Sequence, residues 1–387
     1  MRSLHHLLTA AAKQKRLPTV LAYNRIDGPG SSLDLRAFQQ AFWSLPQIPR
    51  DLFADPQMGW TRGLPRTVGI TINTGTKIYA EPFDSELIAV QSIEYGTEVI
   101  GKPGEVLPKK ENWLLKIVDS FGLKGVKFVL HNLRPGIQSS GLGGSASATT
   151  GVCILANELA ARPLSAVQIV SMASLIEQDF GVSITGTQEQ SNVVFGGVCD
   201  YTWFPWGVPR GNDAGYGASI RTELLPPSRY EELEKRLAIF HSGITRASKD
   251  VNAVWISALY QLQGYQLHKR KLDIAYRFRE ALRLSKWEAV RESIQEYQEV
   301  RTSLCPAYMD GAKEIQGFAH EKDCVAFPLG AGGGGGILVF GPDPPSLLTL
   351  REELSGVYRE IPFKIQASGH EVLNLPFQEE MPCNSQS

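Results

Sequence analysis

Apolar positions along the chain recur at two spacings, one typical of strands and the other of helices. Alternating or short apolar runs predict strands at residues 19–23, 68–74, 77–80, 89–95 and 126–131, with a short turn joining the second to the third. Later strands are expected at residues 193–205, 237–241, 325–327, 337–340 and 363–367. Helical spacing predicts helices at residues 1–17, 113–122, 145–161 and 165–180, and two or three more within residues 250–300.

The order of these elements bears on the fold class. Strands and helices come in groups, without the regular strand–helix alternation of a doubly wound sheet, and this favours an α+β fold. Gly, Pro and Asn cluster at residues 207–217 and predict a boundary between an N-terminal domain at 1–206 and a C-terminal domain at 207–387. Residues 35–65 are rich in proline and are interpreted as an insertion or lid.

Composition narrows the class of protein. The 387 residues carry 39 basic and 40 acidic side chains, and a net charge of −1 argues against a dedicated nucleic-acid binder. The five cysteines include no C-x-x-C pair, which argues against a disulfide framework or a zinc site and fits a reducing cytoplasm. The apolar stretch Leu7–Ala12 is too short to cross a membrane. We therefore expect a cytoplasmic protein without a nucleic-acid or membrane partner, and a homodimer is compatible with the sequence.

A glycine-rich loop precedes the helix predicted at residues 145–161. It reads P-G-I-Q-S-S-G-L-G-G-S-A-S from Pro135 to Ser147, directly after a predicted strand. Glycines let backbone N–H groups approach a ligand closely, and the helix N-terminus behind them adds partial positive charge. The loop lacks both the dinucleotide-binding spacing and the G-x4-G-K-[ST] pattern. It is nevertheless placed tightly between strand and helix, and this predicts a phosphate-binding site.

A second glycine run, Gly330–Gly336, lies about 190 residues later, between two short predicted strands. Glycine runs also occur as flexible linkers. Because strands flank this one, it favours close backbone packing or the approach of a ligand.

Three carboxylates and two arginines are candidates for chemistry beside these loops. Glu177 and Glu189 flank T-G-T-Q shortly after the first loop, and Asp34 follows a Gly/Ser-rich turn. Phosphoryl transfer needs one carboxylate near Mg²⁺ and another that orients the acceptor hydroxyl. Arg25 and Arg246 lie in Gly/Ser/Thr-rich stretches, where a guanidinium could contact phosphate through two nitrogens.

Taken in order, these motifs resemble those of the GHMP kinases, which include galactokinase, homoserine kinase, mevalonate kinase and phosphomevalonate kinase. Residues 141–146 are similar to the second motif of that family, and residues 330–335 to its third. More narrowly, the chain resembles the bacterial D-glycero-D-manno-heptose 7-phosphate kinase branch, which groups with fucose-1-kinases. The further similarities are Arg25 nine residues before Asp34, I-E-Q-D at Glu177, Q-E-Q followed by F-G-G at Glu189, S-G-I-T-R-A-S at Arg246, and F-K-I-Q-A-S-G-H-E-V at 363–372. The resemblance covers roughly residues 19–375.

The resemblance implies a fold and an activity. The fold would combine an N-terminal domain like domain 2 of ribosomal protein S5 with a C-terminal ferredoxin-like domain, and the site would lie between them. The activity would be ATP-dependent and Mg²⁺-dependent phosphorylation of a small sugar or sugar phosphate at the anomeric hydroxyl.

The resemblance also implies roles for particular residues. Glu189 and Arg25 would be catalytic, and Ser145 and Glu177 would hold Mg²⁺. The ATP phosphates would lie on Pro135, Gly141, Leu142, Gly143, Gly144, Ser145, Ala146 and Ser147. The acceptor would bind to Asp34, Gly332, Gly333, Gly334 and Arg246.

Three positions depart from the pattern of the family. Glu189 stands where the catalytic residue is usually Asp, Gly144 stands where the loop usually has its first Ser, and Phe327 stands where many relatives carry Lys. These departures leave two alternatives beside the sugar kinase. One is a catalytically weak or inactive pseudokinase that senses nucleotide and sugar, and the other is a kinase with a non-sugar alcohol acceptor.

Overall fold

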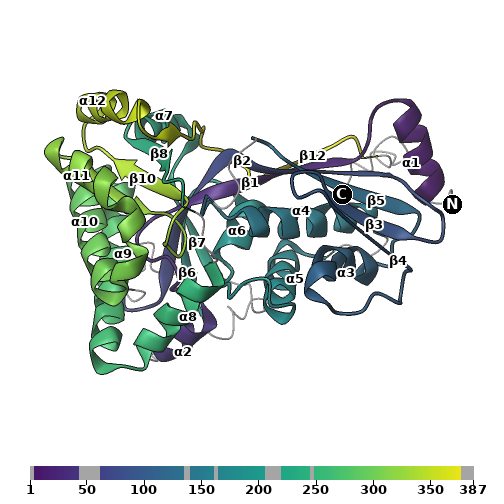
Figure 1. The fold of residues 1–387 in the computed structure, drawn as a ribbon, viewed down its shortest axis with the longest axis horizontal. Coiled ribbons are helices and arrows are strands. Elements are labelled where there is room, and N and C mark those ends of the chain that lie inside the picture. Colours follow the sequence, from purple (N-terminus) through teal and green to yellow (C-terminus); the bar gives the residue numbers. More distant parts are fainter. Residues whose placement is uncertain are drawn as a thin grey trace, which may run out of the picture.

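The computed structural model describes residues 4–42, 62–134, 140–160, 164–204, 219–244 and 248–375, which form an elongated molecule with one sheet in each half (Figure 1). The strands are β1 (Thr19–Asp27), β2 (Arg66–Pro82), β3 (Ile88–Ser92), β4 (Thr97–Gly101), β5 (Val126–Asn132), β6 (Val198–Trp203), β7 (Ser219–Leu225), β8 (Leu237–His241), β9 (Val325–Pro328), β10 (Gly336–Phe340), β11 (Arg359–Glu360) and β12 (His370–Leu373). The helices are α1 (Leu4–Lys13), α2 (Arg36–Phe42), α3 (Trp113–Ser120), α4 (Gly144–Leu159), α5 (Ala166–Asp179), α6 (Gln188–Phe195), α7 (Tyr230–Glu234), α8 (Ser248–Leu259), α9 (Leu262–Arg283), α10 (Trp287–Leu304), α11 (Lys313–Glu321) and α12 (Pro344–Ser355).

The larger sheet has eight strands among the described residues, in the order β12-β1-β2-β5-β3-β4, with β6 and β7 joined to β2. Only β3 and β5 pair in parallel within this described sheet. Apolar side chains of α3, α4 and α5 pack on it and form one of the hydrophobic cores. Consecutive helices therefore pack on a mainly antiparallel sheet, in agreement with the predicted α+β class.

Strand β2 corrects one sequence prediction, because residues 66–82 form one continuous strand and not two strands joined by a turn. Gly75 lies inside it at φ +149°, and the pairing with β1 shifts register between Tyr23 and Asn24. A Cβ at Gly75 would lie 2.0 Å from the carbonyl oxygen of Ala22. The glycine therefore permits a bulge that bends the strand without reversing it.

The second sheet has the order β11-β8-β10-β9, all antiparallel. Its chain order is strand, helices, two strands, helix, strand, which is the ferredoxin-like arrangement. Side chains of α11 and α12 cover one face of this sheet, and those of α9 and α10 pack on the other.

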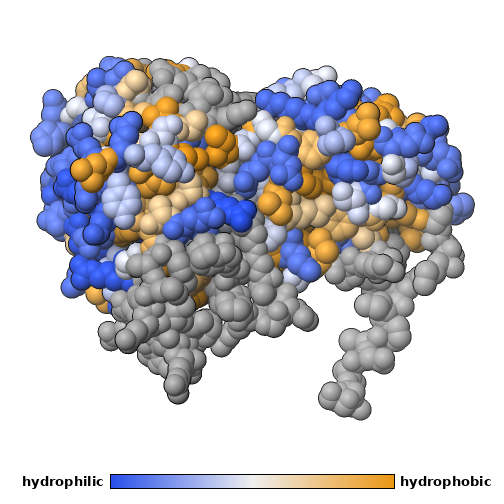
Figure 2. All heavy atoms as spheres, turned by 90° about the horizontal axis from the view of Figure 1, so that it is seen from below, coloured by the Kyte–Doolittle hydropathy of each residue, from blue (hydrophilic) through white to orange (hydrophobic). Residues whose placement is uncertain are grey.

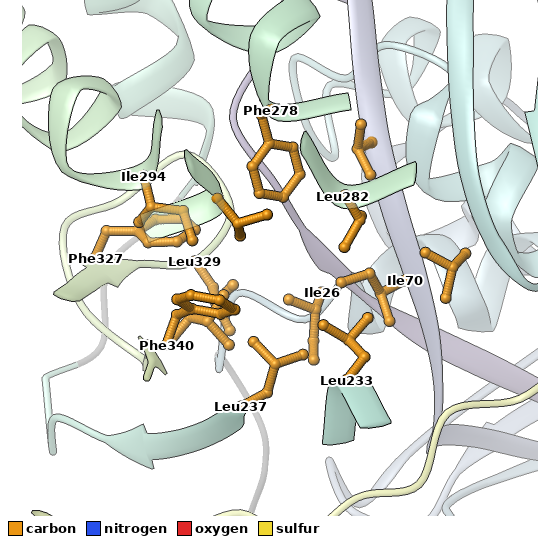
Figure 3. Close-up of a cluster of buried hydrophobic side chains, with 14 of the residues drawn as sticks. Ile26, Ile70, Leu233, Leu237, Phe278, Leu282, Ile294, Phe327, Leu329 and Phe340 are labelled. Atoms are coloured by element: carbon orange, nitrogen blue, oxygen red, sulfur yellow. The ribbon is translucent and has the colours of Figure 1, made fainter. Parts of the chain in front are cut away.

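The two halves of the molecule share a hydrophobic core (Figure 3). Ile26 and Ile70 of the large sheet meet Phe327 and Phe340 of the small sheet there, and Phe278 of α9 closes the cluster. All five are at most 3% exposed. Burial of a side chain of this size stabilises a fold by roughly 1.5–3 kcal/mol, so this cluster fixes the position of one half against the other.

Several other boundaries differ from the sequence predictions. Residues 188–195 form helix α6 in place of the start of a strand, and residues 36–42 of the predicted lid form α2. Residues 363–367 contribute only an isolated bridge from Ile365 to Ile72, and the terminal strand is β12. Strands β7 and β12 belong to the large sheet, and the domain boundary at residue 207 stays a prediction.

Hydrophilic side chains cover the outer sides of both halves on the face shown in Figure 2, with apolar groups interspersed. Among the described segments, no helix is long and apolar enough to cross a membrane.

Candidate functional site

The two glycine-rich loops lie directly against each other. The backbone N–H of Gly336 donates to the carbonyl oxygen of Ser140 at 2.6 Å. A Cβ at Gly141 would lie 2.9 Å from the carbonyl oxygen of Leu329, and one at Gly330 would lie 3.1 Å from that of Gly141. Both glycines have positive φ, +71° and +62°. Larger residues would separate the loops, so glycine is required where segments from the two sheets meet.

Helix α4 begins at the first loop. Gly143 caps it at φ +87°, and Gly144 and Ser145 in its first turn are exposed. The first N–H groups of a helix have no partner within the helix and carry partial positive charge. Ser147 is instead buried, with its hydroxyl 2.9 Å from that of Thr76. The exposed part of this helix end is suited to an anion, and Ser147 anchors it to β2.

Arg25 lies in β1 with 3% of its surface exposed. Its Nη1 donates to the carbonyl oxygen of Gly141 at 2.8 Å and lies 3.0 Å from Oδ1 of Asp27. Its Nη2 is paired with the carboxylate of Glu189 on α6. This guanidinium therefore connects the first glycine loop to an acidic side chain 164 positions later in the sequence.

Asp34 is a third carboxylate close to Arg25. Its Oδ2 accepts a hydrogen bond from the backbone N–H of Gln188 at 3.0 Å, and the residue is 5% exposed. Burial raises the pKa of Asp34, and the N–H of Gln188 and the charge of Arg25 oppose that shift. Burial likewise raises the pKa of Glu189, against the opposing charge of Arg25. Both carboxylates thus lie at the first turn of α6, and the charge of Arg25 acts on the pKa of each.

Glu177 of α5 is fully buried behind Ser145. It accepts hydrogen bonds from the hydroxyls of Thr149 and Ser183 at 2.6 and 3.1 Å, and from Gln190 at 3.4 Å. Burial raises its pKa from the ordinary 4.5 to about 7, and the negative charge of Glu189 acts in the same direction. Among the described residues, no cation lies within ion-pair distance of this carboxylate.

These groups surround an open pocket that encloses about 460 Å³ of empty space, its mouth included. Its described lining includes the predicted residues Arg25, Asp34, Ser145 and Glu189. From the second glycine run it includes Gly330 and Ala331, whereas Gly332, Gly333 and Gly334 lie further along the loop, and their contact with an acceptor stays a prediction. The lining residues that sequence reasoning missed are Ser31, Ser32, Leu35, Ser183, Ile184, Thr185, Gly186, Gln188 and Asn252.

Two predicted site residues, Pro135 and Arg246, lie outside the described residues. Leu142 and Ala146 are buried beside the first loop, at 1% and 0% exposure. Their side chains therefore pack in the core and leave the loop backbone to face the pocket.

Phe327, one of the departures from the family pattern, is 1% exposed and contacts the ring of Tyr297 edge-on at 5.8 Å. Arg301 of α10 is a cation next to the second glycine loop. It donates to the carbonyl oxygens of Pro328 and Gly330 at 2.7 and 3.1 Å. This arginine was not predicted, because nothing in its local sequence distinguishes it from a surface charge on an amphipathic helix.

Lys271 of α9 is a buried cation close to the pocket, at 1% exposure. Its Nζ lies 5.4–5.8 Å from the ring centres of Phe38, Trp255 and Tyr297. Burial lowers its pKa from 10.5 to about 7, and the charge of Arg301 adds to this shift, while Asp34 and Asp27 oppose it.

We expect Lys271→Met to flatten the dependence of stability on pH. A folded-state pKa of about 7 means that folding releases this proton between pH 7 and 10.5. The free energy of unfolding of the native chain should therefore rise with pH in that window, by up to about 1.4 kcal/mol per pH unit from this group. Urea denaturation at pH 7, 8 and 9 measures the slope, with Lys269→Met, exposed on the same helix, as the control. If the free energy of unfolding of Lys271→Met rose with pH as steeply as that of the native chain, the lowered pKa of Lys271 would be contradicted.

Gly186→Ala tests the sequence prediction that Asp34 binds an acceptor: by that prediction the substitution weakens acceptor binding and leaves nucleotide binding unchanged. A Cβ at Gly186 would lie 2.0 Å from Oδ2 of Asp34, so that carboxylate must move. A displacement of about 1 Å at such a site can cost on the order of 100-fold in rate. Acceptor KM and nucleotide affinity would be compared with those of Gly317→Ala, a glycine of α11 with open space around it. Unchanged acceptor KM would show that Asp34 does not position the acceptor.

Part of this chain is similar to the GHMP kinases. Residues 110–197, which include the first glycine loop, Glu177 and Glu189, match the N-terminal domain of the GHMP kinases. The chain is 24% identical over 247 residues to D-glycero-alpha-D-manno-heptose 7-phosphate kinase of Campylobacter jejuni. That alignment covers 62% of this chain and 68% of the relative.

Two solved structures share the fold over nearly their whole length. One is Streptococcus pneumoniae phosphomevalonate kinase in complex with phosphomevalonate and AMPPNP, with a TM-score of 0.66 and 12% identity over 90% of this chain and 99% of the other. The other is a D-glycero-D-manno-heptose 1-phosphate kinase from Bacteroides thetaiotaomicron. Its TM-score is 0.57 and its sequence identity 18%, and the match covers 92% of this chain and 98% of that one.

Proposed function

Because this chain carries a GHMP kinase N-terminal domain and has the GHMP kinase fold, we propose that it is an ATP-dependent kinase of a sugar or sugar phosphate. The phosphoryl acceptor is the anomeric hydroxyl, and the product is a sugar 1-phosphate. One observation carries the proposal. The Arg25–Glu189 ion pair and Asp34 line the same pocket as Ser145, and Ser145 is exposed in the first turn of α4. This arrangement supports the proposal that an anion site and an acceptor site lie next to each other.

The nucleotide phosphates bind at the first glycine loop. Backbone N–H groups of residues 143–145 offer unpaired donors, and the dipole of α4 favours their negative charge. The AMPPNP complex of the pneumococcal relative supports a nucleoside triphosphate as the ligand of this fold.

Mg²⁺ fits the residues behind that loop. Glu177 is a fully buried carboxylate with a raised pKa, and a cation close to it would stabilise its charged form. With the hydroxyl of Ser145 it forms an oxygen-only donor set, which Mg²⁺ prefers when phosphate oxygens complete its shell. When bound there, the ion neutralises charge on the transferring phosphoryl group.

The transfer itself is a displacement at phosphorus. The anomeric oxygen forms a bond to the γ-phosphorus, the bond from that phosphorus to the bridging oxygen breaks, and ADP leaves. The carboxylate of Glu189 orients the hydroxyl and accepts its proton, and Asp34 holds a neighbouring hydroxyl. Arg25 fixes Glu189 in place, because the ion pair and the bond to Gly141 hold both ends of the guanidinium.

Coupled ADP release tests this proposal. The panel is Mg-ATP with free and phosphorylated heptoses, fucose, galactose, mannose and glucuronate. The expected result is turnover with at least one sugar and a product that mild acid hydrolyses, as it does anomeric phosphates. If no sugar supports ADP release while calorimetry still shows ATP binding, the sensor or the non-sugar kinase replaces this proposal.

A further inference from the structure

Near its C-terminal end the chain passes from β11 in the second sheet back to β12 in the large sheet. We call residues 366–370 of this passage the C-terminal clamp. The N–H of Tyr23 in β1 donates to the carbonyl oxygen of Gly369 at 3.0 Å. The N–H of Gly197, two residues after α6, donates to the carbonyl oxygen of Gln366 at the same distance. The clamp is thus bonded to β1 and to the chain that leaves α6, the two elements from which the ion-paired residues of the pocket come.

The end of α6 packs directly against the clamp. A Cβ at Gly369 would lie 2.2 Å from the carbonyl oxygen of Asn192 and 2.4 Å from that of Val193. A Cβ at Gly196, the residue that caps α6, would lie 2.3 Å from the backbone nitrogen of Gly369. These distances leave no room for a methyl group, so the two backbones are in contact and α6 cannot shift towards the clamp.

His370 adds a directed contact to the same helix end. Its Nδ1 lies 3.0 Å from the carbonyl oxygen of Val193, and because a carbonyl oxygen only accepts, Nδ1 is the donor. The last carbonyl groups of a helix have no partner within it. The N–H that would bond Val193 in a longer helix is that of Gly197, which donates to Gln366 instead. His370 therefore satisfies this carbonyl group and ties the helix to the clamp.

Helix α6 depends on such contacts for its position. It has eight residues, and helices of this length are not stable by themselves in water. Its N-cap residue, Thr187, makes no side-chain capping bond. Val193 lies about one turn after Glu189, so a shift of the helix end reaches that carboxylate. A displacement of about 1 Å in a catalytic group can cost on the order of 100-fold in rate.

We propose that the C-terminal clamp holds α6 where Glu189 can orient the acceptor hydroxyl, and that His370 is a positioning residue which acts on Glu189 through this helix. This inference rests on the proposed kinase function and extends it to a segment outside the pocket. His370 does not belong to the described lining of the pocket, so its effect on turnover passes through α6.

The first arm of the test examines the contact without any substrate. Hydrogen-exchange mass spectrometry would compare the native chain with His370→Ala and with His370→Asn, since asparagine also carries a donor nitrogen on Cγ. Backbone amides at the end of α6 should exchange about fivefold faster in His370→Ala, as expected for one lost hydrogen bond, and at nearly the native rate in His370→Asn. Unchanged exchange in His370→Ala would overturn the proposal.

The second arm measures turnover with the sugar that releases ADP. His370→Ala should lower kcat about tenfold and change the KM for ATP less than threefold, and His370→Asn should restore kcat to within about threefold of the native value. Gln316→Ala is the control for a general loss of stability, because it also removes a half-buried side-chain bond to a backbone carbonyl, that of Ala326. It should leave kcat unchanged.

Combination with Glu189→Gln distinguishes positioning from general support of the fold. If the clamp acts through Glu189, His370→Ala lowers the residual turnover of Glu189→Gln less than about threefold. An equal loss on both backgrounds would overturn the proposal and show that His370 only supports the fold. Turnover that falls in Glu189→Gln but not in His370→Ala would overturn the role of the clamp and leave the kinase function intact. Absence of ADP release by the native chain with every sugar would overturn both.

Discussion

Glu189→Gln is expected to lower turnover by about 1,000-fold while leaving ATP affinity within a few-fold, because it removes the carboxylate that we propose as the proton acceptor. The amide has nearly the size of the carboxylate but cannot take a proton from the sugar hydroxyl. It also leaves Arg25 with Asp27 as its remaining carboxylate partner among the described residues. In the proposed arrangement the ATP phosphates contact the loop N–H groups and not Glu189, so ATP affinity should change little.

Glu189→Asp distinguishes the chemistry of this residue from its packing. Aspartate is the residue that the resembling kinases carry here, and it keeps the carboxylate one methylene further back. We expect it to retain far more turnover than Glu189→Gln. Single-turnover kinetics with saturating Mg-ATP measures the difference. Similar turnover in Glu189→Gln and the native enzyme would remove Glu189 from the reaction.

Glu177→Gln is expected to remove most activity and yet stabilise the protein in the absence of metal. Burial raises the folded-state pKa of Glu177 to about 7. The contribution of its protonated form to the free energy of unfolding is therefore complete below pH 4.5 and is lost as the pH rises through 7. Above pH 7 the native chain therefore holds an uncompensated buried charge, at a cost of about 3 kcal/mol. The neutral amide avoids that cost, and it is also a poor ligand for Mg²⁺.

Two measurements test the Glu177 prediction. The midpoint of thermal unfolding at pH 8 in EDTA should rise in Glu177→Gln, and the turnover at saturating Mg-ATP should fall. Glu158→Gln, an exposed glutamate on α4, should change neither. Loss of both stability and activity would mean that Glu177 is a structural hydrogen-bond acceptor for Thr149 and Ser183.

The local parts of this site were predictable from sequence. Glycines between a strand and a helix specify the loop at residues 141–145, and the helix begins one residue from the expected place. Arg25, Asp34 and Glu189 were named from short motifs, and the structure brings all three to one pocket. Short motifs carry this information because the backbone geometry they need is set by neighbouring residues.

The parts that depend on distant segments could not be predicted. Helix α6 was missed because V-V-F near its end has strand propensity, and its place at the end of the T-G-T-Q turn, beside β1, overrides that preference. Asn252, Lys271 and Arg301 lie on long helices whose pattern indicates only which face is apolar. Their approach to the pocket follows from the hydrogen bonds of α8 and α10 to the second glycine loop and from the packing of α9 against α8. The spacing of residues in the sequence does not predict how these helices pack.

Phosphorus NMR of one reaction mixture tests the central claim most directly. The native enzyme and Glu189→Gln would each be incubated with Mg-ATP and the sugar that releases ADP most rapidly. The account predicts ADP together with a phosphate signal split by the anomeric proton in the native sample, and almost unchanged ATP with Glu189→Gln. ADP with free inorganic phosphate, or equal consumption of ATP by both proteins, would contradict the claim that this pocket transfers phosphate to a sugar.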